Sequence, residues 1–282
     1  MILTNKYGLP EAFVRACSVE RHNKTGNYSA TTLNKGVKEI VLSERHWEEM
    51  TADVSENVWA IFGTACHELF ERVPDNCFHE ESVTAEIDGM TVTGRVDSYD
   101  MENATVFDWK TASVWKIQFK DFSDWKQQGL TYAWLLNQNG LKVNKCVFIA
   151  LLKDHSKSKA KVDATYPQSP VFKYEFDVTE ADLQYTDKRI RTKLAEIKNA
   201  LTLSDEEIAP CTKEERWADN DKFAVMKNGR KTALRVFDSK EDAEQYKAQA
   251  GGDYIEHRPA ISRKCEDYCP CKDFCSFYKK GE

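Results

Sequence analysis

The sequence contains no long hydrophobic run. Its longest apolar stretch, CVFIALL at residues 146–152, is far shorter than the roughly 20 residues that span a bilayer. The opening residues, MILTNKYGLPEAF, lack the basic and then apolar segments of a secretory signal peptide. There is also no internal repeat and no low-complexity linker. We therefore expect a folded cytoplasmic protein that does not engage membranes.

Positive charge is scarce relative to negative charge. The chain has 40 Lys and Arg residues against 46 Asp and Glu residues, so it does not coat nucleic acid by net charge alone. Two segments depart from this average. Residues 153–161 carry four lysines and one aspartate, and residues 222–235 carry five basic residues and no acid. Each segment is either a solvated surface or a track for a nucleic-acid backbone.

Cysteines are present in an odd number, nine, and the cytoplasm keeps thiols reduced, so a disulfide framework is not expected. Four of them lie within eleven residues, CEDYCPCKDFC, at residues 265–275. Thiols at this density favour a soft metal site, either zinc or an iron–sulfur cluster. The pairs 265/269 and 271/275 match loosely the C-x₂₋₄-C spacing of structural zinc sites.

Helix and strand patterns in the first 210 residues predict a mixed α/β domain. Residues 55–73 have the apolar stripe of an amphipathic helix with Ser55 as its cap. Residues 82–97 predict two strands around an Asp88-Gly89 turn. Further strands are expected at residues 104–110, 145–152 and 171–178, and further helices at about 123–138 and 180–201.

The pattern changes after Cys211. Residues 223–237 predict a hairpin with an Asn228-Gly229 turn, followed by a short helix that begins after Ser239 and by a returning strand. We therefore expect three parts in the chain. They are a core domain at residues 1–210, a ββαβ insertion at 211–264 and a cysteine-rich tail at 265–282.

Two carboxylates and a lysine are expected to converge at one edge of the sheet. Asp108 and Lys110 point to the same face of their strand because side chains alternate. Asp97 ends the preceding strand, which should lie alongside. Converging carboxylates repel one another unless a cation joins them, and oxygen ligands of this kind suit Mg²⁺ or Mn²⁺. The alternative for Asp108 and Lys110 is a surface ion pair.

The two helices that flank these strands carry polar residues at helical spacing. Gly63, His67 and Glu71 are at positions i, i+4 and i+8, opposite the apolar stripe. If that face covers the sheet edge, His67 offers an imidazole ligand and Gly63 permits close approach; otherwise it is an ordinary polar surface. In the second helix Gln128 and Tyr132 are i, i+4 neighbours, and Tyr132 is equally compatible with the core.

Four motifs together resemble the RecB-like branch of the PD-(D/E)XK nuclease superfamily, over about residues 55–132. They are GTACHELFE at 63–71, GRVD at 94–97, DWK at 108–110 and QGLTY at 128–132. The resemblance implies a restriction-endonuclease-like mixed β-sheet flanked by helices. It also implies a divalent-metal-dependent deoxyribonuclease, expected to be an exonuclease in DNA recombination, repair or phage DNA processing.

The resemblance assigns roles to individual residues. His67, Asp97 and Asp108, with the backbone carbonyl of Trp109, are expected to hold Mg²⁺ or Mn²⁺. Lys110 is expected to position or help deprotonate the attacking water, which makes Lys110, Asp97 and Asp108 the expected catalytic residues.

The same resemblance extends to contacts with the substrate. Gln128 and Tyr132 are expected to contact the DNA or steady the site. The resemblance also favours the interpretation that the two basic segments bind the phosphate backbone of DNA. We take Arg230 and Lys231 as the expected DNA contacts in the second basic segment.

The tail resembles that of CRISPR-associated RecB-like exonucleases and of related nucleases in double-strand-break processing, which carry a [4Fe–4S] cluster. In those proteins one cysteine precedes the nuclease motifs and three close the chain. The three closing ligands here are expected to be Cys265, Cys269 and Cys275. Cys211 is the expected fourth, although it follows the nuclease motifs, and Cys17 is the fallback. Cys271 is an additional thiol, and Zn²⁺ remains the alternative metal.

No Walker A loop is present to drive a helicase. The nearest string, GMTVTGR at residues 89–95, has Arg95 where the lysine belongs. The expected substrate is therefore DNA that is single-stranded or has a free end, or DNA opened by a separate helicase or recombination protein. The alternative function is a catalytically inactive nuclease-fold module that binds DNA or a partner and is stapled by a metal cluster. Asp97, Asp108 and Lys110, all present, argue against that alternative.

Overall fold

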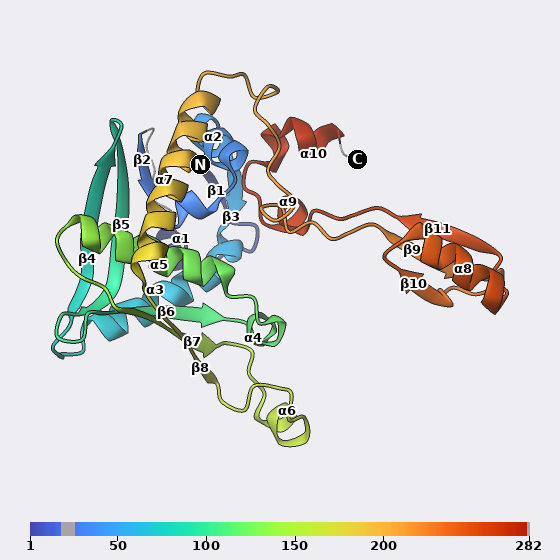
Figure 1. Cartoon of the computed structure of the whole chain (residues 1–282), viewed down its shortest axis with the longest axis horizontal. Coiled ribbons are helices and arrows are strands. Elements are labelled where there is room, and N and C mark those ends of the chain that lie inside the picture. Colours follow the sequence, from blue (N-terminus) through green and yellow to red (C-terminus); the bar gives the residue numbers. More distant parts are fainter. Residues whose placement is uncertain (18–25, 281–282) are drawn as a thin grey trace. The chain divides into compact units, whose positions relative to one another are not determined.

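The protein is described here by a computed structural model that covers residues 1–17 and 26–280 (Figure 1). The chain divides into two compact units, Met1–Leu203 and Ser204–Glu282. The predicted boundary lies slightly later, at residue 210. None of the helices in the described ranges is both long enough and apolar enough to span a bilayer.

The first unit contains a mixed six-stranded sheet with helices around it, in agreement with the predicted fold class. Its strands are β1 (Ile2–Thr4), β2 (Asn27–Ser29), β3 (Thr51–Asp53), β4 (Phe78–Ile87), β5 (Met90–Asp100), β6 (Thr105–Ala112), β7 (Lys145–Leu152) and β8 (Val171–Asp177). Its helices are α1 (Glu11–Ala16), α2 (Val37–Arg45), α3 (Val58–Glu71), α4 (Val114–Phe119), α5 (Ser123–Gln138), α6 (Lys157–Val162) and α7 (Glu180–Ala200), with short 3-10 turns η1 (Thr32–Asn34) and η2 (Val54–Asn57).

The sheet order is β2-β5-β6-β7-β8, and β4 also pairs with β5. Strand β2 runs parallel to β5 and β6 runs parallel to β7, whereas β4, β5 and β6 are joined by antiparallel pairing, as are β7 and β8. The predicted turn joins β4 to β5, with φ values of 51° at Asp88 and 80° at Gly89. Two consecutive left-handed residues match the twist of a tight hairpin. The short elements before α3, which include a parallel pair of β1 and β3, were not expected from the sequence.

Helix α5 supplies much of the core. Trp134 is 2% exposed, and Leu135 and Leu136 are buried with it. Gly129 lets this helix approach the sheet, because a Cβ there would lie 3.0 Å from the rings of Phe148 and Phe176. Helix α7 packs on α5 and has a buried stripe of its own, so a layer of helices covers the sheet.

Helix α3 corrects two expectations. The cap is not Ser55, because η2 precedes the helix and the Asp53 carboxylate accepts a hydrogen bond from the Ser55 backbone N–H. The expected apolar stripe is largely exposed: Phe62 is 41% exposed and Leu69 is 63% exposed. The face that packs on the sheet is instead the one that carries Gly63 and His67. Helical periodicity identifies two faces, but only packing decides which one is covered.

The second unit contains a three-stranded antiparallel sheet of order β10-β9-β11. Its elements are β9 (Lys222–Met226), β10 (Arg235–Phe237), α8 (Lys240–Ala250), β11 (Tyr254–Arg258), α9 (Arg263–Asp267), the 3-10 turn η3 (Lys272–Phe274) and α10 (Ser276–Lys280). The connection from β9 to β10 spans residues 227–234, which is longer than the two-residue turn expected at Asn228-Gly229.

Candidate metal and catalytic site

The candidate site forms where β5 and β6 separate. The two strands pair only as far as Ser98 and Phe107, and Asp97 and Asp108 are the next residues along each strand. The gap between the strands is spanned by the Trp109 N–H, which donates a hydrogen bond to Asp97 Oδ2 at 2.8 Å. A diverging strand pair leaves room for side chains, and the two predicted carboxylates lie on either side of the opening, close enough for the Asp97 charge to add to the rise that burial causes in the pKa of Asp108.

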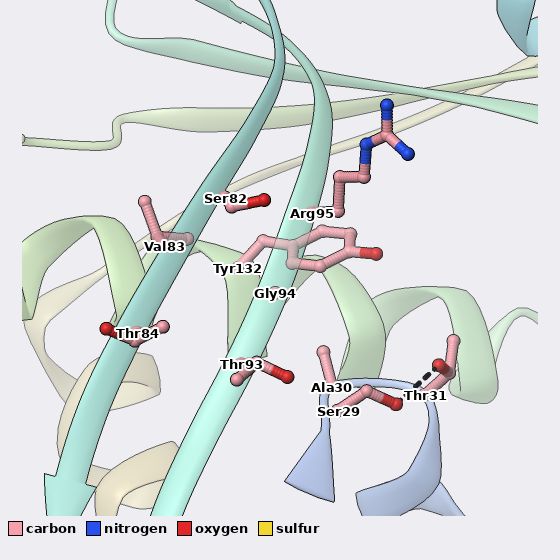
Figure 2. Close-up of a pocket in the computed structure, with 10 residues that line it drawn as sticks. All are labelled: Ser29, Ala30, Thr31, Ser82, Val83, Thr84, Thr93, Gly94, Arg95 and Tyr132. Atoms are coloured by element: carbon pink, nitrogen blue, oxygen red, sulfur yellow. Dashed lines mark hydrogen bonds between the residues drawn. The ribbon is translucent and has the colours of Figure 1, made fainter. Parts of the chain in front are cut away.

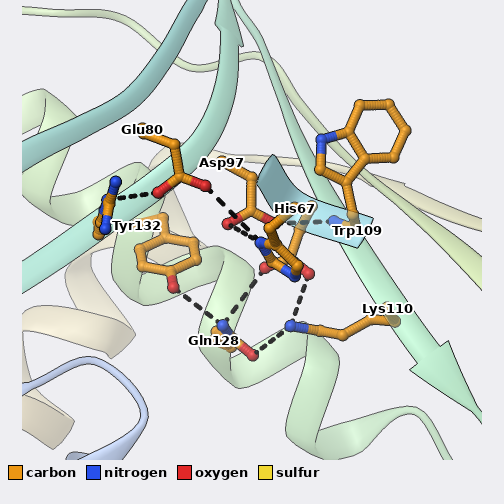
Figure 3. A network of polar contacts seen from close by, with 9 residues as sticks. His67, Glu80, Asp97, Trp109, Lys110, Gln128 and Tyr132 are labelled. Atoms are coloured by element: carbon orange, nitrogen blue, oxygen red, sulfur yellow. Dashed lines mark hydrogen bonds and ion pairs between the residues drawn. The ribbon is translucent and has the colours of Figure 1, made fainter. Parts of the chain in front are cut away.

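Three side chains from three elements form a potential ligand set. Ligand atoms of His67 on α3, Glu80 on β4 and Asp97 on β5 all lie within 4.8 Å of one another. His67 Nδ1 is 3.3 Å from Asp97 Oδ1 and 3.7 Å from Glu80 Oε1 (Figure 3). His67 and Asp97 were expected to meet at this edge. Glu80 was not expected, and it supplies a second carboxylate to the set.

Glu80 occupies an unusual backbone position. Its φ is 53°, in the left-handed region that a glutamate rarely adopts, and such residues concentrate at functional sites. Its carboxylate forms an ion pair with Arg95. Burial raises the pKa of Glu80, and the charge of Arg95 opposes that rise. Glu80 lies opposite Asp97, between the pairs His79–Ser98 and Glu81–Val96. Counting residues back from the predicted hairpin turn would therefore have identified Glu80 as a neighbour of Asp97.

A second polar group surrounds Asp108, which is only 1% exposed. Lys110 Nζ lies 2.5 Å from Asp108 Oδ1 and donates a hydrogen bond to Gln128 Oε1 at 3.0 Å. The Gln128 amide N–H₂ donates to Asp108 Oδ2 at 3.3 Å and to the Tyr132 hydroxyl at 2.9 Å (Figure 3). The i, i+4 pair of α5 thus lies over β6, as its spacing allows, and Tyr132 is both buried and part of the network.

Electrostatics at the site favour a bound cation. Burial raises the pKa of Asp108, and the nearby Lys110 charge opposes that rise. The hydrogen bond to Asp97 raises the pKa of His67, so the imidazole here has an excess of negative charge around it. Asp108 Oδ1 is buried and forms an ion pair with the Lys110 ammonium. A carboxylate oxygen has room for a second partner, so this one could also bind a hard divalent ion.

Helix α3 is seated on the opposite face of β6 from α5. The Phe70 ring stacks on Trp109 with centroids 4.5 Å apart, while Asp108 and Lys110, its alternating neighbours, face Gln128. A Cβ on Gly63 would lie 3.6 Å from Thr111 Oγ1, an ordinary contact, so close approach does not require this glycine. Glu71, the last residue of the helix, is exposed.

A cavity of about 350 Å³ adjoins the site (Figure 2). Arg95 and Tyr132 border it and also belong to the polar network just described. Most of its other polar lining groups are hydroxyls, contributed by Ser29, Thr31, Ser82, Thr84 and Thr93. Gly94 opens onto the cavity, and a Cβ there would meet Leu135 Cδ1 at 2.6 Å. A hydroxyl-lined cavity beside a carboxylate cluster provides neutral hydrogen-bond donors and acceptors for a polar ligand.

The cysteines of the tail lie together in the second unit. Cys265, Cys269 and Cys275 are partly buried, and Cys271 is 1% exposed. The sulfurs of Cys269 and Cys271 are 3.5 Å apart. Burial raises the pKa of the Cys265 thiol, and the neighbouring Cys269 and Cys275 raise it further. The arrangement offers several thiols of one small region to a soft metal.

Cys211 belongs to the same unit as the tail. Arg216 donates a hydrogen bond to the Cys211 carbonyl at 2.9 Å and another to Ser262 Oγ at 2.7 Å, and it accepts one from the Lys264 N–H. This arginine therefore ties the segment that begins at Cys211 to the helix that carries Cys265. The fallback residue, Cys17, is in the first unit, where its thiol donates to the Val54 carbonyl.

The predicted DNA contacts of the second basic segment lie in a loop. Arg230 and Lys231 are exposed between β9 and β10. Lys222, at the start of β9, forms an ion pair with Asp238, which neutralises one of the five positive charges of the segment. The loop is held at its base by the Asn228 N–H, which donates to Asp253 Oδ2 at 2.6 Å.

No protein-family model matches the sequence, and no curated protein matches it either. Among solved structures, SSO0001 is 18% identical with a TM-score of 0.44 over 64% of this chain and 84% of that one. The alkaline exonuclease LHK-Exo of Laribacter hongkongensis is 12% identical with a TM-score of 0.40, over 63% and 90%. A phage related exonuclease of Haemophilus somnus 129PT is 12% identical with a TM-score of 0.40, over 62% and 95%. The likenesses are distant, and those with a descriptive name are to exonucleases.

Proposed function

We propose that the first unit is a divalent-metal-dependent deoxyribonuclease that hydrolyses phosphodiester bonds. The observation that carries the proposal is the meeting of His67, Glu80 and Asp97 beside a buried Asp108–Lys110 pair. Carboxylates and an imidazole can hold a metal, and the lysine adds a fixed positive charge next to it. Hydrolysis of a phosphodiester needs an activated water and neutralisation of negative charge on the phosphate, and this set of groups meets both needs.

The residues that would hold the ion are His67, Glu80, Asp97 and Asp108, with the Trp109 carbonyl as a further oxygen. Their donor set fits Mg²⁺ or Mn²⁺, and the imidazole favours Mn²⁺ because Mg²⁺ is bound mainly through oxygen. When bound, the ion would lower the pKa of a water and stabilise charge on the phosphate oxygens.

Lys110 has a defined role because two neighbours fix its ammonium. Asp108 and the Gln128 carbonyl oxygen hold Nζ in place, and Gln128 is itself oriented by Tyr132. We propose that the ammonium orients the attacking water and balances charge on the scissile phosphate. Gln128 and Tyr132 then act as positioning residues, and they need not touch the DNA.

The second unit would contribute DNA contacts and a metal cluster. Arg230 and Lys231 offer two exposed positive charges for the phosphate backbone. We propose a [4Fe–4S] cluster held by Cys211, Cys265, Cys269 and Cys275, with Zn²⁺ as the alternative. Such a cluster would stabilise a unit that is small for a single hydrophobic core. We propose that the protein acts as an exonuclease on free DNA ends in recombination, repair or phage DNA processing. A separate helicase would aid it by opening the DNA.

The test uses the full chain, prepared without oxygen and supplied with end-labelled single- and double-stranded DNA and with Mn²⁺ or Mg²⁺. We expect metal-dependent cleavage, and we expect Asp108→Ala and Lys110→Ala each to reduce its rate by several orders of magnitude while DNA affinity is retained. A wild-type protein that binds DNA but never cleaves it would instead identify a catalytically inactive binding module. Undiminished cleavage by either variant would remove that residue from the mechanism.

A further inference from the structure

An exposed group of aromatic side chains lies beyond the catalytic groups in the first unit. Trp59 and Phe62 on α3 are 53% and 41% exposed, and Trp115 and Phe119 on α4 are 62% and 75% exposed. Trp115 and Phe119 stack on each other with centroids 6.0 Å apart. We call these four residues the aromatic shelf. Burial of such side chains is normally favourable, so four of them exposed on two helices of one unit require an explanation.

Helix α3 connects one half of the shelf to the strand that carries Asp108 and Lys110. Helix α3 runs antiparallel to β6: Phe70 stacks on Trp109, Gly63 lies beside Thr111, and Trp59 follows one helical turn further out. Trp59, Gly63 and His67 are at i, i+4 and i+8, so they share a face. At 1.5 Å per residue, Trp59 is about 12 Å along the helix axis from the His67 ligand.

Residues that follow β7 contact both halves of the shelf. Lys153 Nζ lies 4.0 Å from the centroid of the Trp59 ring, and the Lys153 N–H donates to the Ala112 carbonyl at the end of β6. The next residue, Asp154, accepts hydrogen bonds from Ser113 and from the Val114 N–H, and these fix the start of α4. The carboxyl ends of the parallel strands β6 and β7 thus position both aromatic pairs, and such ends are where open α/β sheets bind ligands.

We propose that the aromatic shelf binds unpaired bases of a single DNA strand as its backbone reaches the metal site. The inference rests on the proposed function, since it takes DNA as the ligand. Every base has a face that stacks on an aromatic ring, whereas the bases of an intact duplex are already stacked. Lys153 places a positive charge against the Trp59 ring, where it can meet a phosphate of the same strand. Exposed rings beside a lysine fit a single strand better than an apolar protein surface.

Binding is measured on the full chain in EDTA, which prevents cleavage, by fluorescence anisotropy of a labelled single-stranded oligonucleotide and of the matching blunt duplex. Trp59→Ala is expected to weaken single-strand binding roughly 5- to 150-fold, the range for loss of one base–aromatic stack. Duplex binding should stay unchanged. Trp59→Phe should retain most of the affinity because it keeps a ring, and Trp59→Leu should not. Leu69→Ala, an exposed apolar residue at the other end of α3, is the matched control and should behave as wild type.

A strand that lacks bases separates stacking from charge. Wild type should bind this abasic strand more weakly than Trp59→Ala binds the normal strand, because the abasic strand loses every stack on the shelf. Trp59→Ala should discriminate between the two strands less than wild type does. Lys153→Ala should act differently: it should lower affinity for both strands and reduce the slope of log K against log salt by about 0.7 per lost phosphate contact.

The inference is overturned if wild type does not bind the single strand, or if a Trp59→Ala, Trp115→Ala double variant binds it as wild type does. It is also overturned if single strand and duplex lose affinity equally, or if Trp59→Leu binds like Trp59→Phe. A shelf that another protein or another part of this chain covers would give unchanged DNA binding. Failure of the proposed function is a separate result, because it is absence of cleavage with Mn²⁺, whereas shelf binding is read in EDTA.

Discussion

At the scale of single residues, the backbone conformation of Glu80 and its ion pair with Arg95 together fix the position of its carboxylate. Its left-handed backbone directs the carboxylate toward His67 and Asp97, and the ion pair with Arg95 compensates for its partial burial. Glu81, the next residue, is exposed on the same strand and makes none of these contacts. The pair of adjacent glutamates therefore provides a matched comparison of a residue inside the ligand set with one outside it.

We expect Glu80→Gln to weaken Mn²⁺ binding by roughly 10- to 100-fold, because the set loses one negative charge and a group that orients His67. Glu81→Gln should bind Mn²⁺ as wild type does. Isothermal titration calorimetry of the two variants measures the difference directly. Equal affinities in the two variants would show that Glu80 only pairs with Arg95.

Asp108 leads to a pH-dependent prediction for the metal-free protein. Burial raises its pKa from 3.8 to about 6 in the folded state, with Lys110 opposing the shift. A raised carboxyl pKa means that the folded state binds the proton more tightly than the unfolded state does. Its stability contribution is therefore largest below pH 4 and is lost as the pH rises toward 6.

Asp108→Asn removes this titration. In EDTA, its stability relative to wild type should rise between about pH 4 and pH 6 and stay constant above that range. Urea unfolding at several pH values measures this difference. Asp108→Asn also removes the ion pair with Lys110, but a loss of stability that is the same at every pH does not alter the trend. A stability difference that falls with pH would mean that the Lys110 charge, not burial, dominates the Asp108 carboxyl.

At the scale of elements, the contact between β5 and α5 decides how the polar network is held. Gly94 is a point of close approach, since a Cβ there would lie 2.6 Å from Leu135 Cδ1 and 3.0 Å from Tyr132 Cδ1. Tyr132 accepts the hydrogen bond that orients Gln128, and Gln128 in turn holds Lys110. We expect a change in backbone spacing at Gly94 to be transmitted to Lys110, the proposed catalytic residue.

Gly94→Ala is expected to destabilise the protein by about 1–3 kcal/mol, the usual cost of overpacking, and to lower the cleavage rate. Gly63→Ala is the matched control, because its Cβ would find an ordinary contact with Thr111 and because alanine favours a helix. It should be neutral or stabilising. Thermal unfolding of both variants tests the difference, and a Gly94→Ala protein as stable as wild type would show that α5 can shift without cost.

The β9–β10 loop gives a prediction about substrate binding. Charge reversal of both Arg230 and Lys231 should weaken DNA binding for all sequences and reduce the salt slope by about 0.7–0.9 per lost phosphate contact. Reversal of Lys240 and Lys247 on α8 changes the net charge of the same unit equally and is the control. If both pairs have the same effect on the slope, the loop is only part of the general charge of the unit.

At the scale of the whole molecule, two compact units carry different chemistries. The first holds the carboxylates, the imidazole and Lys110 on a mixed sheet, and the second gathers five cysteines at 211 and 265–275. In the second unit Arg216 links the segment of Cys211 to α9, and its guanidinium lies 4.2 Å from the Phe277 ring centroid. These contacts link the segment of Cys211 to the tail of the unit.

We expect protein prepared without oxygen to be brown and to contain about four iron atoms per chain, as Cys₄ ligation of a [4Fe–4S] cluster requires. Cys265→Ser should remove the colour and make the second unit sensitive to protease, since metal binding contributes to folding. Cys271→Ser should keep the colour. A colourless preparation with stoichiometric zinc would identify the zinc alternative, and a colour lost only in Cys271→Ser would change the ligand set.

The sequence by itself determined the features that follow from local periodicity. Strand alternation placed Asp108 and Lys110 on one face, the Asp88-Gly89 turn set the β4–β5 hairpin, and α5 has the bounds that its pattern predicts. These features depend on neighbours within a few residues, so the order of the amino acids is sufficient to predict them.

Only the tertiary structure decided which surfaces of these elements are covered. The sequence left open whether the face of α3 with Gly63 and His67 covers the sheet or is a polar surface. Packing placed Gly63 and His67 on the sheet, while Phe62 of the apolar stripe remained exposed. The entry of Glu80 into the ligand set required the pairing of β4 with β5, and the meeting of Trp59 with Lys153 joins residues nearly one hundred positions apart. Contacts between distant segments depend on how whole elements pack, and no short stretch of sequence specifies that.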